Sequence, residues 1–394
     1  MIKKKILREK GYKFRLYPNK KQKILINKSA GCARFIYNHF LAKAKKDEYK
    51  TYTKYSKQLT KLKKELNWLK EPDKYALQNA LKDLDKAFNN FFSGKYKFPQ
   101  FKSKKNIKNS YRTNKFIRKN GTTNIEIKNN KIKLPKLGWI KFSKSQEVKG
   151  KIINVTISKT NTDKYFVSIA VKEKVEVLNK KDNAVGIDLG LKEFAVTSDG
   201  KKIANPRVLK KYEKKIARLQ RSLARKERGS SNWEKTKKKL AKVHEKTANI
   251  RKDFLHKLST KLICENQTIC LETLKVKNML KNSNSLKPLF DLRKEGFSMT
   301  VFDLALAKLI SDVSWSRFVE YLEYKAEWYG RDLIKIDTFF ASSQLCNNCG
   351  YKNEEVKDLK IRKWKCPGCG KVHDRDINAG KNILNEGLKI KKAS

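Results

Sequence analysis

Residues 185–190 read Val-Gly-Ile-Asp-Leu-Gly, a short apolar segment that contains one carboxylate, Asp188. A second apolar segment, Phe194–Thr197, ends at Asp199-Gly200. Two short apolar runs separated by turn residues predict a pair of neighbouring buried strands. A charge inside a buried strand costs on the order of several kcal/mol unless a cation compensates it. Asp188 is therefore a candidate functional residue, although Gly190 follows it and a turn or capping role fits equally well.

Downstream of these strands, helical and apolar stretches alternate. Two long basic helical stretches, at about 207–227 and 233–264, precede a buried strand at 268–272. A further strand is expected at 333–336, and a last helix from 377 to about 388. Strands that alternate with helices are typical of an α/β layer with a central sheet.

The first half of the chain follows a different pattern. Residues 11–17 alternate polar and apolar side chains and predict a strand that ends at Pro18. From about 20 to 93 the apolar residues recur with a helical period, and strand patterns return between 123 and 171. We therefore expect a small β-barrel with a helical unit inserted after its first strand.

Particular residues define the expected faces of these elements. One inserted helix carries an apolar stripe formed by Leu77, Leu81, Leu84, Phe88 and Phe91. Two hairpins are expected in the barrel. Their facing side chains are expected to be Ile125 and Ile127 with Ile132 and Leu134, and Val155 and Ile157 with Phe166 and Val167.

The charge balance indicates a polyanionic partner. The 394 residues include 95 Lys+Arg against 39 Asp+Glu, which gives a formal net charge of +56. Such an excess makes a compact fold repel itself, whereas each nucleic-acid phosphate that is neutralised releases counterions and adds affinity. A lysine-rich genome would raise the lysine content at solvated positions, but it would raise glutamate as well. Nucleic acid is therefore the expected partner.

A membrane partner fits the sequence less well. No apolar run approaches the ~20 residues that span a bilayer. The basic start, Met1 to Lys5, leads into an alternating strand rather than the apolar core of a signal peptide. Cys32, Cys264 and Cys270 lie in apolar contexts that are typical of reduced, buried thiols. We expect a soluble protein of the cytoplasm or nucleoid.

Four further cysteines form two Cys-x-x-Cys pairs, Cys346 with Cys349 and Cys366 with Cys369. Sixteen residues separate the pairs, and a glycine directly follows each of them. Four thiolates at this spacing suit one tetrahedral structural zinc ion, with no open coordination position. His373 lies nearby and is expected to be structural, because a fifth ligand is unnecessary.

Three more carboxylates stand at the ends of predicted elements. Glu272 ends the strand at 268–272, and Asp374 and Asp376 open the last helix. Clustered carboxylates would hold two Mg²⁺ or Mn²⁺ ions, which activate water and stabilise the leaving oxygen in phosphodiester hydrolysis. Each residue also has a simpler interpretation, since Glu272 could pair with a lysine and Asp374 could cap the helix, leaving Asp376 in its first turn. Together with Asp188, however, they fit one metal site.

The order of these motifs resembles the TnpB family of transposon-encoded proteins. The stretches that carry the resemblance are Gly186–Gly190, Leu271-Glu272, the two cysteine pairs with their glycines, and Asp374–Ala379. Similar stretches at 12–18, 34–38, 89–99 and 251–257 extend it over nearly the whole chain. One departure is Gly380, where the family usually has alanine, and we expect it to affect only the local stability of the helix.

The resemblance implies an α+β multidomain protein with a RuvC-like (RNase H-like) nuclease domain interrupted by a zinc ribbon, as in compact type V CRISPR nucleases. It implies that Asp188, Glu272 and Asp376 are catalytic, with Asp374 the alternative third acid. The implied partners are a transposon-end (omega) guide RNA, whose 3′ segment pairs with the target, and double-stranded target DNA beside a short flanking motif. We expect a monomer bound to one RNA.

The expected domains follow from this resemblance. They are a β-barrel wedge domain at 1–19 and 94–178, a helical recognition insertion at 20–93, the nuclease domain at 184–341 and 371–394, and the zinc ribbon at 342–370. The basic helices at 207–263 and the basic, aromatic segment at 94–118 are expected to hold a phosphate backbone, while base pairing reads the sequence.

Two residues of the recognition insertion are candidate nucleic-acid contacts. Lys74 and Gln78 lie away from the apolar stripe of their helix, in the region where the family faces the duplex that carries the flanking motif. A glutamine can form paired hydrogen bonds with adenine, and a lysine can hold phosphate or donate to guanine. The alternative is that both face only water, as exposed residues of these types usually do.

Other functions remain open on the sequence. A guide-free RuvC-like enzyme acting on branched DNA would need neither the helical insertion, the barrel nor the ribbon. A catalytically silent RNA-guided DNA-binding regulator shares the whole architecture, but loss of an acid would signal it and all three acids are present. A transposase or transposition accessory protein would require strand transfer, and no tyrosine or serine recombinase signature stands out. RNA-guided, metal-dependent DNA cleavage is the leading hypothesis.

Overall fold

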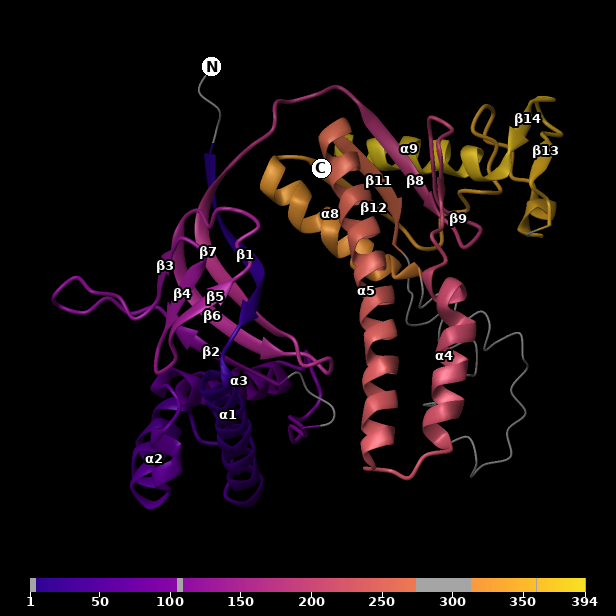
Figure 1. Ribbon diagram of the computed structural model, residues 1–394. Helices are drawn as coiled ribbons and strands as arrows, with labels where there is room; N and C mark the ends of the chain where they lie inside the picture. Colours follow the sequence, from indigo (N-terminus) through magenta and orange to yellow (C-terminus); the bar gives the residue numbers. More distant parts are fainter. Residues whose placement is uncertain (1–4, 105–108, 274–312, 359, 394) are drawn as a thin grey trace. The chain divides into compact units, whose positions relative to one another are not determined.

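The computed structural model divides the chain at Lys174 (Figure 1). Leu7–Lys174 form one unit, and Val175–Ser394 with Met1–Ile6 form the other. The residues that the structure describes are 5–104, 109–273, 313–358 and 360–393. Part of the predicted nuclease domain, residues 274–312, lies outside them. Among the described helices, none is long and apolar enough to cross a membrane.

The first unit is built on a seven-stranded sheet. Its elements are β1 (Lys5–Tyr17), α1 (Lys20–Lys46), α2 (Tyr52–Glu65), the 3-10 helix η1 (Asn67–Lys70), α3 (Lys74–Phe92), β2 (Asn109–Asn114), β3 (Glu126–Lys128), β4 (Lys131–Leu134), β5 (Gly138–Phe142), β6 (Lys151–Lys159) and β7 (Tyr165–Glu176). The strand order is β2-β6-β7-β1-β5-β4-β3. Along the sequence, α1, α2 and α3 lie between β1, which is an inner strand of the sheet, and β2, which is an edge strand. Closure of this sheet into a barrel, and a separate inserted domain, stay predictions.

Two local features of this unit follow the sequence pattern. The stripe of α3 packs inward, with at most 1% of each side chain exposed at Leu77, Leu81, Leu84 and Phe88. Phe91 is partly buried and packs edge-on against Phe98, with ring centroids 5.2 Å apart. In the β3–β4 hairpin Ile127 pairs with Ile132, and Asn129 adopts the left-handed conformation (φ 51°) that its turn requires.

The register of the β6–β7 hairpin differs from the prediction at Val155, which pairs with Ile169, and at Phe166. Ile157 pairs with Val167 as expected, but Phe166 pairs with Ser158. Successive strand residues point to opposite faces of a sheet, so Phe166 lies on the face opposite Val167. There the ammonium group of Lys13 lies 4.7 Å from the centre of its ring. The predicted contact between Phe166 and the apolar face is therefore wrong.

The second unit contains a five-stranded sheet and a two-stranded ribbon. Its described elements are β8 (Ala184–Leu189), β9 (Glu193–Thr197), β10 (Lys202–Ala204), α4 (Val208–Ala224), α5 (Ser231–Glu265), β11 (Thr268–Glu272), α8 (Trp315–Tyr329), β12 (Asp332–Ile336), the 3-10 helix η2 (Glu354–Lys357), β13 (Lys363–Lys365), β14 (Val372–Asp374) and α9 (Arg375–Ala393). The order is β10-β9-β8-β11-β12, with β8, β11 and β12 parallel and β9 and β10 antiparallel. This is the predicted α/β layer.

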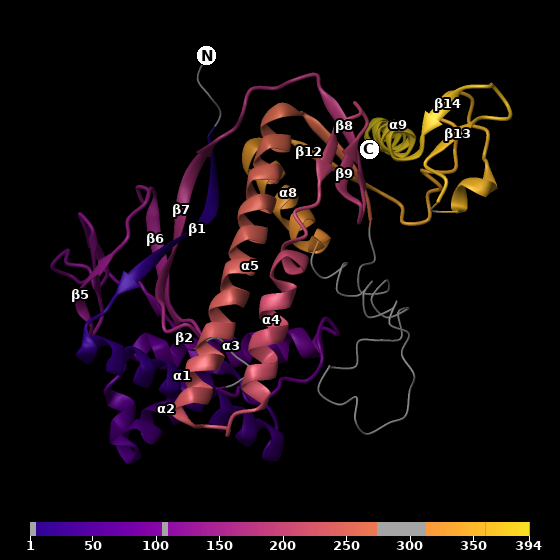
Figure 2. The ribbon, with the colours of Figure 1, turned by 45° about the vertical axis from the view of Figure 1, so that its right-hand side comes forward.

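Alternating side chains give this sheet two different faces. Ile269 and Leu271 of β11 join a buried cluster with residues of α5 and α8. Cys270, which lies between them, packs with Ile383 of α9 on the opposite face. Figure 2 shows α9 end-on at one side of the sheet and α5 with α8 at the other. Any side chain in phase with Cys270 therefore points to the face that α9 covers.

The cysteines outside the two pairs show where the burial pattern was misread. Cys32 and Cys270 are buried as expected, whereas Cys264 is exposed. Cys264 follows the buried Ile263 on α5, and each step along a helix turns the side chain by about 100°. A neighbour of a core residue on a helix can therefore face solvent, so the apolar context of Cys264 did not indicate burial.

Helix α9 approaches β8 so closely that Gly186 has no room for a side chain. A Cβ atom there would lie 2.0 Å from the backbone oxygen of Gly380 and 2.6 Å from the backbone nitrogen of Leu384. At Gly380 a Cβ atom would lie 3.0 Å from the backbone nitrogen of Ser198. Gly380 thus belongs to the contact between helix and sheet, and its influence extends beyond the local helix stability that the sequence indicated.

We expect Gly186→Ala to destabilise the second unit, because the added methyl group would overlap the backbone of α9. Overpacking of this kind typically costs about 1–3 kcal/mol. Gly380→Ala is the matched control: its methyl group meets the backbone at 3.0 Å, and alanine favours a helix by about 1 kcal/mol. Urea unfolding measures both variants. A Gly186→Ala protein as stable as the Gly380→Ala protein would contradict the close contact.

Candidate functional site

Asp188 and Glu272 lie at the carboxyl ends of two neighbouring parallel strands. Ile187 of β8 is in register with Leu271 of β11, and each carboxylate is the next residue along its strand. Ile187 and Leu271 both face α5 and α8, so the residues that follow them point to the α9 face. Both acids are partly buried. Parallel pairing therefore brings together two carboxylates that are distant in sequence.

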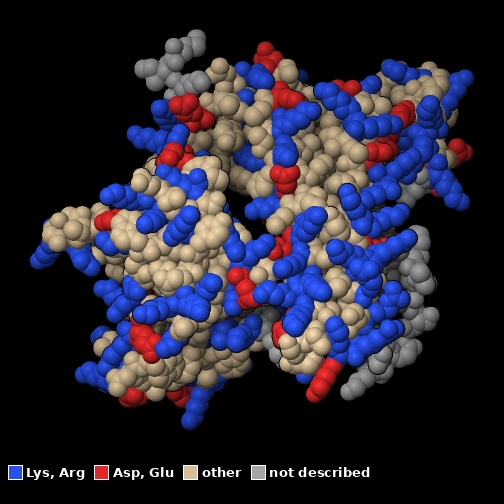
Figure 3. Space-filling view, in the orientation of Figure 1, with Lys and Arg blue, Asp and Glu red and all other residues tan. Residues whose placement is uncertain are grey.

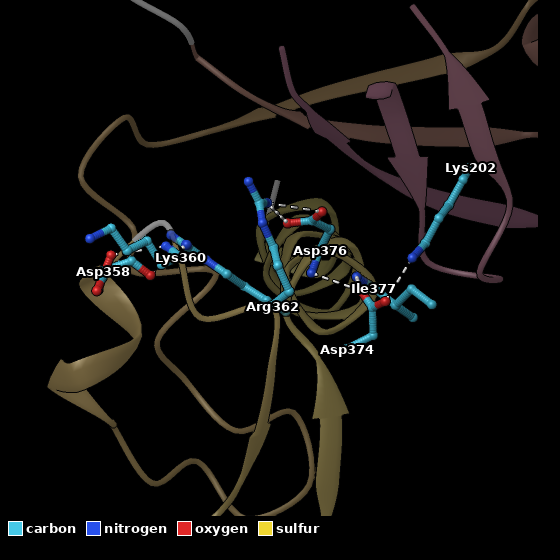
Figure 4. A network of polar contacts seen from close by, with 8 residues as sticks. Lys202, Asp358, Lys360, Arg362, Asp374, Asp376 and Ile377 are labelled. Atoms are coloured by element: carbon cyan, nitrogen blue, oxygen red, sulfur yellow. Dashed lines mark hydrogen bonds and ion pairs between the residues drawn. The ribbon is translucent and has the colours of Figure 1, made fainter. Parts of the chain in front are cut away.

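The two remaining acids have different positions at the start of α9. Asp374 ends β14, and its Oδ1 atom accepts backbone N–H bonds from Asp376 (3.1 Å) and Ile377 (3.2 Å). Its Oδ2 atom forms an ion pair of 2.7 Å with Lys202 of β10 (Figure 4). Burial alone would raise the pKa of Asp374, but these partners lower it below its usual value. Asp374 is thus occupied as a helix cap, which leaves the Asp376 carboxylate in the first turn.

Asp376 has a cationic neighbour that the sequence did not indicate. Arg362, just before β13, places a guanidinium nitrogen 3.4 Å from one carboxylate oxygen of Asp376 and 3.5 Å from the other. Figure 4 shows the arginine reaching the carboxylate from the ribbon side. The ion pair is partly exposed, with 46% of the Arg362 side chain and 25% of the Asp376 side chain accessible. Neither motif spacing nor periodicity distinguishes Arg362 from other basic residues.

The three carboxylates Asp188, Glu272 and Asp376 are coupled electrostatically. Burial, together with the charges of Glu272 and Asp376, raises the pKa of Asp188 to about 7, against the opposing charges of Arg375 and Arg362. Burial also raises the pKa of Glu272, against a hydrogen bond donated by Ser342. The site thus holds more negative charge than its own cations compensate.

A pair of divalent cations fits this excess of negative charge. Among the described residues, the only set of three or more potential ligands within 4.8 Å of one another is the four cysteines, so the three carboxylates are spread more widely. Two ions in a nuclease site stand about 3.5–4 Å apart, so the ligand atoms that hold them are spaced more widely than those around a single ion. Carboxylate oxygens are also the ligands that Mg²⁺ and Mn²⁺ prefer.

The four predicted zinc ligands come together in the ribbon. The Sγ atoms of Cys346 and Cys369 lie 3.7 Å apart, and those of Cys349 and Cys366 lie 3.5 Å apart. Zinc–sulfur bonds of about 2.3 Å in a tetrahedron place sulfur atoms about 3.8 Å apart. Both glycines that follow the pairs adopt positive φ angles, 78° and 70°, which turn each knuckle back toward the ion site. The geometry therefore fits one tetrahedral zinc ion.

His373 lies beside this cluster as a neighbour of a ligand. Its Nε2 atom is 3.1 Å from the Sγ atom of Cys346, within reach of an N–H to sulfur hydrogen bond. Burial, followed by the charges of Lys371 and Lys381, lowers the pKa of His373, so the ring is neutral near pH 7. The indole of Trp364 covers the ring, with centroids 4.9 Å apart. This position agrees with the structural role expected for His373.

The candidate recognition residues lie together on α3 in the first unit. Lys74 is exposed, and its ammonium group lies 5.1 Å from the ring centre of Tyr75 and 5.9 Å from that of Phe116. Gln78, one turn further along, is partly buried. The two side chains therefore share one side of α3, as residues four apart on a helix do.

The hairpin of α4 and α5 presents two rows of cations. One surface hollow on α4 is lined largely by Arg218, Arg221, Arg225 and Lys226, and a second hollow, between the helices, includes Lys215, Lys239, Lys242 and Lys246. Figure 3 shows lysine and arginine gathered over these two helices on the visible face. Residues three and four apart share one side of a helix, so the cations form continuous rows.

We expect the stability of the cation-free protein to depend on pH through Asp188. Its pKa is 3.8 in the unfolded chain and about 7 in the fold, so between these values the folded state holds a proton that the unfolded state has released. The free energy of unfolding therefore falls as pH rises from about 4 to 7. Asp188→Asn removes this loss. Its advantage over the wild type in free energy of unfolding should therefore be larger at pH 8 than at pH 5, by about 1–3 kcal/mol after allowance for partial exposure.

Urea unfolding at pH 5 and pH 8, in buffer without divalent cations, measures this difference. Asp199→Asn serves as the control. Slight burial would raise the pKa of Asp199, but hydrogen bonds from Thr197 and Lys201 and the charge of Lys201 lower it below its usual value. An equal gain for Asp188→Asn at both pH values would show that Asp188 ionises normally in the fold.

Three family models match parts of the chain. The model described as "Probable transposase" matches residues 166–283, and the model described as "Cas12f1-like, TNB domain" matches residues 315–383. A model described as "Helix-turn-helix domain" matches residues 8–54, where the structure has most of β1, the long helix α1 and the start of α2.

Relatives of known name cover almost the full length. A protein of Streptomyces pristinaespiralis named putative RNA-guided DNA endonuclease is 36% identical over 96% of this chain and 90% of its own length. The Escherichia coli K12 protein named putative RNA-guided DNA endonuclease InsQ is 33% identical over 96% of this chain and 92% of its own length. A cryo-EM structure of a Cas12f1–sgRNA–target DNA complex shares the fold, with a TM-score of 0.59 at 14% identity, over 96% of this chain and 99% of that chain. The chain therefore belongs to the TnpB family of RNA-guided DNA endonucleases.

Proposed function

We propose that this chain is an RNA-guided endonuclease that cuts target DNA, and that Asp188, Glu272 and Asp376 form its active site. One observation carries the assignment of the site: burial and the charges of Glu272 and Asp376 raise the pKa of Asp188, so three carboxylates from two parallel strands and one helix act on one partly buried position. Groups whose pKa is perturbed by burial and like charge are typical of functional sites. The family membership supports DNA cleavage as the reaction, and the carboxylate cluster supports the location of the active site.

Asp188, Glu272 and Asp376 would hold two Mg²⁺ or Mn²⁺ ions. When bound, such ions lower the pKa of the attacking water and stabilise the charge that develops on the phosphate and the leaving oxygen. The protein itself contributes the spacing of the acids. The strand register sets the separation of Asp188 from Glu272, and the Asp374 cap, held by Lys202, fixes the helix turn that presents Asp376.

Arg362 is placed to act on the substrate as well as on the site. Its guanidinium group balances part of the charge of Asp376 while no metal ion is bound to that carboxylate. Once Asp376 binds a metal ion, the arginine is available to pair with a phosphate oxygen of the nucleic acid, for which its planar fork of donors is well suited. Its partial exposure allows this exchange of partners.

The partners we propose are one omega RNA, whose 3′ segment guides the protein, and double-stranded target DNA. The cation rows of the α4–α5 hairpin suit a phosphate backbone, because they offer charge without a base-reading geometry. The basic, aromatic segment at 94–118 offers a second such surface, in which exposed Tyr96 and Phe101 are available for stacking on bases. We propose that one protein chain binds one RNA.

We propose the following division of labour along the chain. The wedge domain comprises 1–19 and 94–178, the recognition insertion 20–93, the nuclease domain 184–341 and 371–394, and the ribbon 342–370. The four cysteines of the ribbon would hold one structural zinc ion. The seven-stranded sheet, with β2 and β3 at the ends of its order, would close into the wedge barrel when these edges approach each other.

The coupled carboxylates favour cleavage over the alternative of a silent RNA-guided regulator. A protein that only binds DNA has no use for three acids that repel one another, and would be more stable without one of them. RNA that co-purifies with the expressed protein tests guidance directly. A discrete RNA with a variable 3′ end supports it, whereas bulk RNA fragments favour a guide-free enzyme.

We expect Asp188→Ala, Glu272→Ala and Asp376→Ala each to lower the cleavage rate of guide-matched DNA by at least about 10²–10³-fold, because each removes charge stabilisation from the reacting phosphate. Binding of RNA and target, measured by gel shift, should stay nearly unchanged. Asp374→Ala is the comparison variant: it removes a helix cap worth about 1 kcal/mol and loosens the turn that presents Asp376, so it should still cut, at a reduced rate. If Asp376→Ala cuts and Asp374→Ala does not, the third acid is wrongly assigned.

We expect Gln78→Ala to relax the preference for the flanking motif at one base pair. A good paired hydrogen bond to a base contributes about 1–3 kcal/mol of discrimination, or roughly 5- to 150-fold. A depletion library of flanking motifs, cut by the wild type, by Gln78→Ala and by the control Lys86→Ala, measures this preference. An unchanged motif for Gln78→Ala, at unchanged cutting of the preferred target, would remove Gln78 from the recognition surface and leave Lys74 as the candidate contact.

A further inference from the structure

The first knuckle of the ribbon is fastened to the helix that carries Asp376. The backbone oxygen of Leu345, next to the ligand Cys346, accepts hydrogen bonds from Asn378 (2.7 Å) and Asn382 (2.6 Å) of α9. Asn378 also accepts the backbone N–H of Asn347 at 3.0 Å. Only 2% of Asn378 and 7% of Asn382 is exposed, so water does not compete for these bonds.

The same chain of contacts continues to the carboxylate of Glu272. Asn382 donates a second bond, of 2.8 Å, to the backbone oxygen of Ser342. The hydroxyl group of Ser342 donates a short hydrogen bond to Oε1 of Glu272. Ser342 is 7% exposed, and it lies four residues before Cys346 in one tight segment. A continuous set of hydrogen bonds thus links the zinc-ligand knuckle with Glu272.

The hydrogen bond from Ser342 restricts a flexible side chain. Glu272 stands at the end of β11 and is partly buried, and its carboxylate would otherwise be free to adopt several rotamers. With Oε1 held by the hydroxyl group, the carboxylate is oriented and Oε2 remains available for a cation. Groups that orient a metal ligand in this way typically change metal affinity about 10- to 100-fold when they are removed.

We propose that Ser342 is a positioning residue for Glu272, and that the zinc ribbon holds Ser342 in place through Asn378 and Asn382. Zinc in the ribbon therefore sets the affinity of the carboxylate site for divalent cations, although the two centres share no ligand. This inference rests on the proposed nuclease site. It assigns the ribbon a role inside the catalytic centre, in addition to any contact it makes with nucleic acid.

Binding of Mn²⁺ to the full-length, RNA-free protein, followed by electron paramagnetic resonance, tests the first step. Ser342→Ala should weaken Mn²⁺ binding about 10-fold or more. Ser342→Thr keeps the hydroxyl group and should restore binding. Thr273→Val is the matched control, because its hydroxyl group lies next to Glu272 in the chain but donates to the backbone oxygen of Ile336. Mn²⁺ binding by Ser342→Ala that equals the wild type would overturn the proposal.

Cleavage measurements separate positioning from a general loss of structure. The Mg²⁺ concentration for half-maximal cleavage should rise about 10-fold in Ser342→Ala, while the rate at saturating Mg²⁺ stays within about threefold of the wild type. A purely structural bond would lower stability without moving the Mg²⁺ requirement. Elemental analysis should find about one zinc per chain in the wild type and in every Ser342 variant. Zinc loss from Ser342→Ala would mean that the serine supports the ribbon rather than Glu272, which overturns the proposal.

Removal of zinc tests the second step. Cys366→Ser lies in the other knuckle, outside the 342–347 segment, and should abolish zinc binding and weaken Mn²⁺ binding to the level of Ser342→Ala. The double variant should be no weaker than either single variant, because both interrupt one set of contacts. Additive losses would overturn the link through the ribbon. If Asp188→Ala and Glu272→Ala leave Mn²⁺ binding unchanged, the proposed nuclease site itself fails instead.

Discussion

The close contact between β8 and α9 is the constraint on which the second unit depends. Gly186 leaves the helix backbone within 2.0 Å of where a Cβ atom would stand, so the helix packs directly on the strand. That contact places the first turn of α9, with Asp376, at the edge of the sheet where Asp188 and Glu272 lie near the carboxyl ends of β8 and β11. A helix held further away by a larger side chain would leave the two strand acids without their third partner.

The consequence of this packing is electrostatic strain. Burial and the charges of Glu272 and Asp376 together raise the pKa of Asp188 to about 7. The protein offsets the strain locally, with Arg362 beside Asp376 and Lys202 beside the capping Asp374. Both ion pairs are partly exposed, so these cations offset part of the negative charge without burying the carboxylates. Local instability of this kind is typical of sites that bind metal.

The ribbon is joined to this centre by buried polar contacts. Two asparagines of α9, four residues apart, hold the backbone of the first knuckle, and a serine of the same segment reaches Glu272. Buried hydrogen bonds are costly to leave unmade, so the knuckle and the helix keep one relative position. The ribbon is thus held to α9 and to the end of β11 by hydrogen bonds.

Features that depend on local pattern were determined by the sequence alone. The spacing of four cysteines predicts their cluster, and the apolar stripe of α3 predicts its buried face, because both arise from periodicity or separation within one segment. The carboxylates were recognised as candidates for the same reason: Asp188 interrupts a predicted strand, Glu272 ends one, and Asp376 opens a predicted helix. Register and partner choice were different. The position of Phe166 and the exposure of Cys264 depend on which neighbour each strand or helix meets.

Only the tertiary structure distinguishes the partners of Asp374 from those of Asp376, because the two acids hardly differ in their local sequence. It also revealed Arg362 and Ser342, which no motif marks, and the tight packing of Gly380 against the sheet. Such contacts join residues that lie far apart along the chain, and side chains of the same type occur at many other positions. The sequence can supply the reacting groups, but their environment exists only once the strands, the helix and the ribbon have packed together.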